Sequence, residues 1–336
     1  MPQFSRKAST PQANDAIAVA HRRAADFLDP AALMRIKNLE LRARFVVQGF
    51  LSGLHRSPYH GFSVEFTEYR PYTRGDDPRY LDWRLYARSD RFYLKKFEDE
   101  TNLRCHLLVD LSHSMGYRSV AYDKASYAKT AAATLAYFLS LQRDAVGLVT
   151  FDDKVQESLP ARFRPGHLHR LLVSLERATS GKSTNLAAPL EQVAKTARKR
   201  GMVVLLSDLL APLESLEKQL GYLRSQGHEV TVLRVLDPAE VDFPFQKATL
   251  FHDVESNREI YVDPDLARDQ YRRRFATHAE SLKTLCRRWE IDLYQLVSNE
   301  PLEMALFDLL NSRLRRRRHI ARRGGARPAG QYGGGR

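Results

Sequence analysis

One stretch decides the fold of this chain, Cys105-His106-Leu107-Leu108-Val109-Asp110-Leu111-Ser112-His113-Ser114. Its first half is an apolar run without regular polar alternation, which predicts a strand buried on both faces of a sheet. A carboxylate and two hydroxyls follow at every second position, where this strand ends. In an open parallel α/β sheet, ligands bind at that end of the strands. We therefore expect a functional site at Asp110, Ser112 and Ser114.

Two later segments point to the same edge of the sheet. The run Gly-Met-Val-Val-Leu-Leu-Ser-Asp at 201–208 is a second buried strand, with the Asp208 carboxylate at its carboxyl end. The polar loop Ser-Gly-Lys-Ser-Thr-Asn-Leu at 180–186 brings the hydroxyl of Thr184 just ahead of a predicted helix. These are hard oxygen donors with no Cys or imidazole among them, and such donors suit Mg²⁺ or Mn²⁺ better than Zn²⁺.

From residue 102 onward, predicted strands and helices alternate along the chain. The strands are expected at 103–109, 145–151, near 155, 202–207, 229–236 and 292–297, with a hairpin inserted at 249–262. The helices are expected at 124–142, 167–177, 186–198, 213–225, 265–289 and 301–314. Strands separated by helices predict an α/β fold with a doubly wound, mostly parallel sheet.

The five polar residues at these strand ends form a known pattern. Asp110, Ser112, Ser114, Thr184 and Asp208 match a metal-ion-dependent adhesion site, so about two-thirds of the chain resembles a von Willebrand factor type A domain. The resemblance implies that these residues, some of them through water, hold one Mg²⁺ (or Mn²⁺) and leave a position for an acidic side chain of a partner. The alternative is a degenerate site that only caps loops, because Ser and Asp are also ordinary loop and N-cap residues.

A second motif precedes the first strand. It reads Glu-x-Arg at 68–70, Gly-Asp-Asp at 75–77, Asp-Trp at 82–83 and Ala-Arg at 87–88. Over about residues 35–300 the chain resembles the domain-of-unknown-function-58 family of bacterial and archaeal proteins. The resemblance implies a von Willebrand A-like domain and a MoxR-type AAA+ ATPase as partner, since the two genes are commonly neighbours. Many members carry N-terminal membrane helices; none is recognisable here, which favours a soluble form.

The residues around this second motif allow two interpretations. Alternating arginines and aspartates could form forked ion pairs that hold a β-rich segment against the following domain. Alternatively, Trp83, Arg79 and Arg88 could dock a partner, since Trp and Arg are favoured at interfaces.

The net charge of +13 is concentrated at one end of the chain. Nine arginines and no acidic residue occur from residue 313 onward, so the rest of the chain is close to neutral. The Gly-rich composition of this end cannot build a core, and we expect a disordered tail that is a solvated appendage, with contact to nucleic acid as the alternative.

Length and composition predict several segments. We expect a loosely ordered extension at 1–35, a β-rich segment at 36–101, the von Willebrand A-like domain at 102–312 and the tail at 313–336. Without an apolar run long enough for a membrane span or a secretory signal, a cytoplasmic location is expected. Cys105 and Cys286 are predicted to be buried small apolar residues rather than disulfide or zinc partners.

Three function classes remain open on the sequence. The first is a non-enzymatic, metal-dependent interaction module that works as an adaptor or co-chaperone of the ATPase. The second is a hydrolase using Ser112, although no Gly-x-Ser-x-Gly elbow is present. The third is a metal-dependent phosphoesterase. The chain has no complete phosphate-binding loop, so it is not expected to hydrolyse ATP by P-loop chemistry.

Overall fold

The structure is a computed structural model of the 336-residue chain. It describes residues 29–56, 69–72, 86–88, 91–95, 103–177, 186–197, 199–253 and 258–310. The predicted tail, most of the predicted N-terminal extension, Arg79, Trp83 and Thr184 lie outside these residues.

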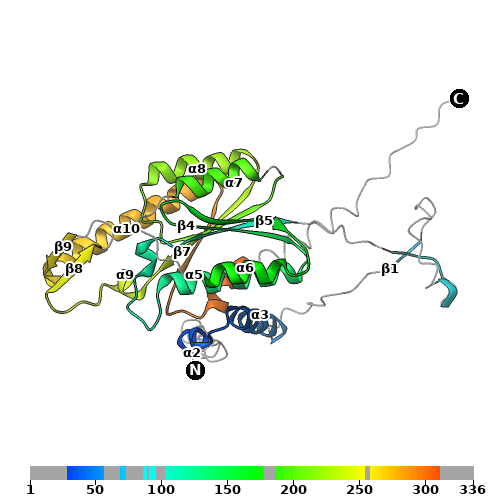
Figure 1. Cartoon of the computed structure of the whole chain (residues 1–336), viewed down its shortest axis with the longest axis horizontal. Coiled ribbons are helices and arrows are strands. Elements are labelled where there is room, and N and C mark those ends of the chain that lie inside the picture. Colours follow the sequence, from blue (N-terminus) through cyan, green and yellow to red (C-terminus); the bar gives the residue numbers. More distant parts are fainter. Residues whose placement is uncertain are drawn as a thin grey trace, which may run out of the picture.

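A six-stranded sheet forms the centre of the molecule (Figure 1). Its strand order is β10-β7-β6-β3-β4-β5. The strands are β3 (Arg104–Asp110), β4 (Ala145–Phe151), β5 (Val155–Arg162), β6 (Met202–Ser207), β7 (Glu229–Leu236) and β10 (Asp292–Val297). All neighbouring strands pair in parallel except β5, which runs antiparallel to β4 at the edge. The predicted mostly parallel α/β sheet is confirmed.

The sheet is wound in both directions from β3. This strand pairs with β4 on one side and with β6 on the other. The chain first builds the side that contains β4 and β5, and then returns to build the side that contains β6, β7 and β10. The connections that leave β3 and β6 therefore diverge, so the carboxyl ends of these two strands are the topological switch point of the sheet, where open α/β folds bind ligands.

Helices cover both faces of the sheet (Figure 1). One face carries α3 (Leu39–Arg56), α5 (Lys124–Leu141), α6 (His167–Glu176) and the helical residues 302–310. The other carries α7 (Ala187–Thr196), α8 (Leu213–Ser225) and α10 (Pro264–Arg288). Within β3, Leu107 and Val109 belong to the first core cluster and Leu108 to the second, so the strand is buried on both faces as predicted.

Residues 39–56 differ from the expectation of a β-rich segment, because they form the helix α3. The spacing of Leu39, Ala43, Val46 and Phe50 brings these residues onto one helical face, and all of them are buried. The ring of Phe50 packs edge-on against Phe138 of α5, with ring centroids 5.9 Å apart. This part of the N-terminal segment therefore belongs to the core of the α/β domain rather than to a separate unit.

The described part of the second motif is small. A two-stranded antiparallel ribbon pairs β1 (Tyr69–Pro71) with β2 (Tyr93–Lys95).

A further helix, α2 (Pro30–Arg35), precedes α3 and is capped by the side chain of Asp29.

A hairpin lies outside the main sheet. It consists of β8 (Thr249–Asp253) and β9 (Arg258–Val262), follows the short helix α9 (Pro238–Asp242), and extends to one end of the molecule beside α10 (Figure 1). Aromatic rings hold it there: Phe251 of β8 packs near Phe243, which in turn lies 4.7 Å from the ring of Tyr271 in α10. The predicted hairpin at 249–262 is confirmed.

The predicted burial of Cys105 and Cys286 as free thiols is confirmed as well.

Candidate functional site

Asp110 is the last residue of β3 and is completely buried. Its Oδ1 atom accepts the backbone N–H of Ser112 at 2.9 Å, and its Oδ2 atom accepts the hydroxyl of Ser207 at 2.6 Å. Ser207 is the last residue of β6, so this carboxylate joins the two neighbouring strands at the switch point of the sheet. The orientation of Asp110 is therefore fixed from both strands before any ligand arrives.

Burial raises the pKa of Asp110 to about 6. The neighbouring carboxylate of Asp208 raises it further, while the hydrogen bonds from Ser207 and Ser112 act in the opposite direction. A raised pKa means that the surroundings of this buried carboxylate supply too little positive charge and too few hydrogen bonds to replace its lost hydration. A cation bound beside it would favour the charged form.

Ser112 and Ser114 flank the first turn after β3. Ser112 is buried and precedes the short 3₁₀ helix η2 (His113–Gly116), while Ser114 is half-buried within it. Their Oγ atoms lie 3.2 Å apart. Two oxygens at adjacent octahedral positions of Mg²⁺, each about 2.1 Å from the ion, are separated by about 3 Å. The pair therefore fits a divalent cation of this size.

Asp208 has a partner that the sequence analysis missed. The Nζ atom of Lys124 donates to Oδ2 of Asp208 at 2.9 Å and to Oε1 of Glu240 at 2.6 Å. The side chains of Lys124 and Asp208 are fully buried. Desolvation opposes the charge on Lys124, but the two carboxylates outweigh it and raise the pKa of the ammonium. Lys124 is thus a built-in cation at the carboxyl edge of the sheet.

A weak signal for this contact exists in the sequence. Lys124 opens a helix in which nearly all other inward positions are alanine or large apolar residues. A cation in the first turn also opposes the helix dipole, so it needs a nearby anion. The chain brings that anion from Asp208 and Glu240, which are distant in sequence.

The loop after β3 is tied to the end of β7 through Asp237. Its carboxylate caps α9 by accepting the backbone N–H of Ala239, and it also accepts both the backbone N–H and the hydroxyl of Ser119. Glu240 closes the reciprocal capping box by accepting the backbone N–H of Asp237 at 2.8 Å. This arrangement fixes Glu240 where it meets Lys124.

The outcome for the predicted site residues is mixed. Asp110, Ser112, Ser114 and Asp208 lie together at the carboxyl ends of β3 and β6, as their positions in the sequence predicted. Thr184 lies outside the described residues, as do Trp83 and Arg79 from the predicted docking surface. Arg88 is described and is exposed in a short helical turn.

The donor set at this edge is rich in hydroxyls. Within the described parts of the chain, no group of three or more His, Cys, Asp or Glu side chains is arranged to hold a metal ion. A cation at this edge would therefore depend on Ser112 and Ser114, with carboxylates contributing charge nearby.

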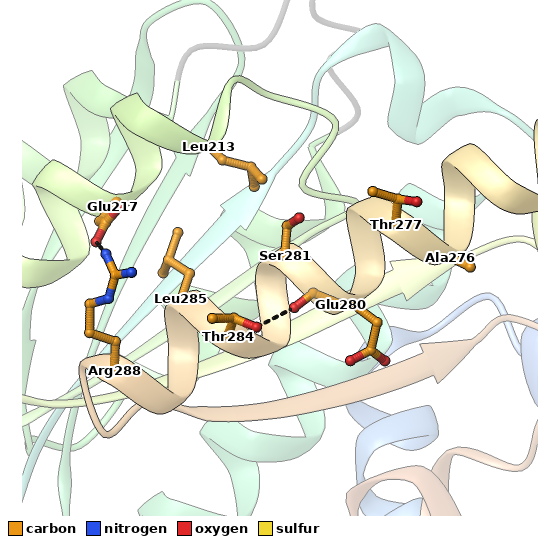
Figure 2. Close-up of a pocket in the computed structure, with 9 residues that line it drawn as sticks. All are labelled: Leu213, Glu217, Ala276, Thr277, Glu280, Ser281, Thr284, Leu285 and Arg288. Carbon is orange, nitrogen blue, oxygen red and sulfur yellow. Dashed lines mark hydrogen bonds and ion pairs between the residues drawn. The ribbon is translucent and has the colours of Figure 1, made fainter.

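A hollow of about 620 Å³ lies between α8 and α10, away from the strand ends (Figure 2). Most of its polar side chains already have partners. Arg288 donates to Glu217 at 2.7 Å, and the hydroxyl of Thr284 donates to the carbonyl of Glu280 at 2.8 Å. We therefore assign no site to this hollow.

In the part of the chain that the structure describes, no helix is both long and apolar enough to cross a bilayer.

Two solved structures resemble this chain in shape. One is an aerotolerance-related membrane protein from Bacteroides fragilis, at 16% identity and a TM-score of 0.43, covering 62% of this chain and 99% of that one. The other is BatB from Bacteroides thetaiotaomicron, at 14% identity and a TM-score of 0.40, with the same coverage. These TM-scores are too low to support a conclusion about the fold, which is instead assigned from the chain's own strand pairing.

Sequence relatives are more informative. An uncharacterised protein of Mycobacterium tuberculosis, Rv1480, is 30% identical over 258 residues, which cover 75% of this chain and 80% of that protein. The family model described as protein of unknown function DUF58 matches residues 68–284, which is more than half of the chain. The chain therefore belongs to the DUF58 family.

Proposed function

We propose that this chain is a non-enzymatic, metal-dependent protein-interaction module with a von Willebrand factor A-like site. The observation that carries the proposal is the pair of hydroxyls on Ser112 and Ser114, 3.2 Å apart beside the buried Asp110 carboxylate at the switch point of the sheet. The bound ion would be Mg²⁺ or Mn²⁺, and its role would be to accept a carboxylate from a partner protein.

The five residues of the proposed site would differ in how they bind the metal ion. Ser112 and Ser114, together with Thr184, which precedes α7 in the sequence, would be near ligands. Asp110 would contribute charge directly or through water, since each of its oxygens already accepts a hydrogen bond. Asp208 would act through water, since its Oδ2 atom is engaged by Lys124.

The charge balance supports an acidic partner. Asp208 and Glu240 share the single ammonium of Lys124, whereas in the described residues Asp110 is contacted by neutral donors only, so its charge is the one most available to a divalent ion. Hydroxyl ligands carry no charge, and an ion held by them keeps a net attraction for an external carboxylate.

The partner we propose is a MoxR-type AAA+ ATPase, with this chain acting as its adaptor or co-chaperone in the cytoplasm during assembly or metal maturation of other proteins. This part of the proposal rests on the family resemblance. It predicts a complex that EDTA weakens.

The test mixes the purified chain with the MoxR-type ATPase of the same genome. Complex formation should fall with EDTA and in the Ser112→Ala/Ser114→Ala variant, whose circular dichroism should stay native. Full complex formation in EDTA would contradict the metal dependence, and the surface around Trp83 would then become the candidate.

A hydrolytic role is less well supported. In the described residues the hydroxyl of Ser112 pairs with Ser114, rather than with a histidine that could activate it. Turnover of a generic phosphoester or carboxyl ester, abolished by Ser112→Ala, would favour the hydrolase over the interaction module.

A further inference from the structure

A second groove opens beside the strand-end site. It lies between the hairpin β8–β9, the helix α10 and the carboxyl end of β7, and its volume is about 630 Å³. Glu240 lines this groove and at the same time contacts Lys124, so the groove adjoins the buried ion cluster. A volume of this size is typical of ligand-binding pockets.

Arg234 on β7 lines the groove and is 2% exposed. Its guanidinium stacks over the ring of Phe275, 4.9 Å from the centroid, and its Nε atom makes a long contact of 3.4 Å with the carbonyl of Asp208. Its Nη2 atom is buried and has no hydrogen-bond partner among the described residues. A buried charged donor without an acceptor is costly, so this position favours a ligand that brings one.

The charge of the groove favours an anion. Arg274 adds a second guanidinium at its exposed rim. Among the described residues that line it, Glu240 is the one acidic side chain, and its carboxylate shares the ammonium of Lys124 with Asp208. Burial and the charge of Arg234 lower the pKa of His278, which is held by the carbonyl of Leu209. Two guanidinium groups therefore face one carboxylate in the described lining, and one further negative group balances the charge.

The rest of the lining is apolar and partly uncovered. Phe251 and Phe275 form the wall, while Leu210 and Ile260 are 55% and 56% exposed at its edge. Exposed apolar side chains around a charged pocket are typical of a surface that a protein segment covers.

We propose that this groove binds a segment of a protein partner in which an aspartate or glutamate is flanked by apolar residues. The carboxylate pairs with Arg234 and Arg274, and the flanking side chains cover Ile260 and Leu210. This recognition uses no metal ligand and is independent of the proposed function at the strand ends.

The test uses a random twelve-residue peptide library displayed on phage, selected on the immobilised full-length chain in EDTA. Selected peptides should be enriched in Asp or Glu beside aromatic or aliphatic residues. A synthetic copy of the best peptide should bind at least about tenfold more weakly to Ile260→Ser and to Arg234→Met.

A matched control exists on the same hairpin. Leu250 is 55% exposed and pairs with Tyr261 on the face opposite to Ile260 and Phe251, so Leu250→Ser should bind the peptide like the wild type. The Ser112→Ala/Ser114→Ala variant should do the same. If Arg234→Met does not fold, the comparison of Ile260→Ser with Leu250→Ser still shows whether the peptide binds in this groove.

Three results would overturn the proposal. They are a selection without acidic enrichment, equal binding to Ile260→Ser and wild type, and loss of binding in the double serine variant, which would locate the peptide at the strand ends. Because every step is done in EDTA, failure here leaves the metal-dependent proposal untouched, and the converse holds too.

Discussion

Lys124 Nζ lies 2.9 Å from Asp208 Oδ2, and both side chains are completely buried. The ammonium comes from the start of α5 and the carboxylate from the end of β6, so the contact joins a helix to the sheet across 84 positions of sequence. Glu240, which is 19% exposed, completes the cluster from α9. The edge of the sheet where a cation is predicted therefore already contains a positive charge of its own.

Replacing Lys124 should destabilise the fold strongly. Lys124→Met keeps the length of the side chain but leaves Asp208 and Glu240 uncompensated, and breaking a buried pair in this way costs about 3–5 kcal/mol. Urea unfolding followed by circular dichroism measures the loss. The double variant Lys124→Met/Asp208→Asn should lose clearly less than the sum of the two single variants. Additive losses would mean that the contact contributes nothing of its own.

Divalent cations should stabilise the wild type against heat. An ion that binds only the folded state adds about 2.7 kcal/mol when its concentration is 100 times Kd. The Tm should therefore rise with Mg²⁺ or Mn²⁺ in the wild type, and stay constant in Asp110→Ala and in Ser112→Ala/Ser114→Ala. Ser225→Ala, which removes an exposed hydroxyl bonded within α8, is the matched control and should respond like the wild type. An equal rise in Asp110→Ala would exclude Asp110 from the site.

Acid should destabilise the protein through His106. Burial lowers the pKa of this side chain to about 4, and the charges of His228 and Arg104 act in the same direction. Between pH 6.5 and 4, His106 is protonated in the unfolded chain but still neutral in the folded one. The contribution of His106 to the free energy of unfolding is therefore fully present above pH 6.5 and is lost as the pH drops toward 4. The loss reaches about 3 kcal/mol.

The variant His106→Leu tests this origin of acid sensitivity. Its free energy of unfolding should change less between pH 6.5 and 4 than that of the wild type. His169→Gln alters an exposed histidine and should leave the pH profile as it is. Identical acid profiles of His106→Leu and wild type would assign the sensitivity to other groups.

Removal of the arginine-rich end should leave the fold intact. The residues after Leu314 carry no apolar periodicity and a high density of like charges, so they cannot contribute a core. A chain truncated after Leu314 should unfold within about 1 °C of the full-length chain in a calorimetric scan. A fall of many degrees would demonstrate that this end docks on the body.

The sheet could be predicted from sequence because its strands are self-contained signals. The apolar run that ends at Asp110 and the run that ends at Asp208 each indicate a strand buried on both faces. The alternation of strands with helices then predicts that these strands pair in parallel, as they do. The convergence of Asp110, Ser112, Ser114 and Asp208 follows from that pairing alone.

Other features depend on contacts that no local pattern contains. Glu240 meets Lys124 only because Asp237 caps α9 and holds the loop after β3, which is a relation among three distant segments. The helix α3 is a different case, because the apolar residues from Leu39 to Phe50 do recur at helical spacing, and the expectation of a β-rich segment over 36–101 did not use that local pattern.

The hydrogen bond from Ser207 to Asp110 spans 97 positions of sequence, and this span determines when the site can exist. When β3, β4 and β5 have been synthesised, one half of the sheet can form, but β6, which contributes Ser207 and is followed by Asp208, is still missing. Closing so long a loop costs entropy before any contact compensates for it. The strand-end site is consequently a late product of synthesis, because a nascent chain cannot assemble it before β6 has emerged and paired with β3.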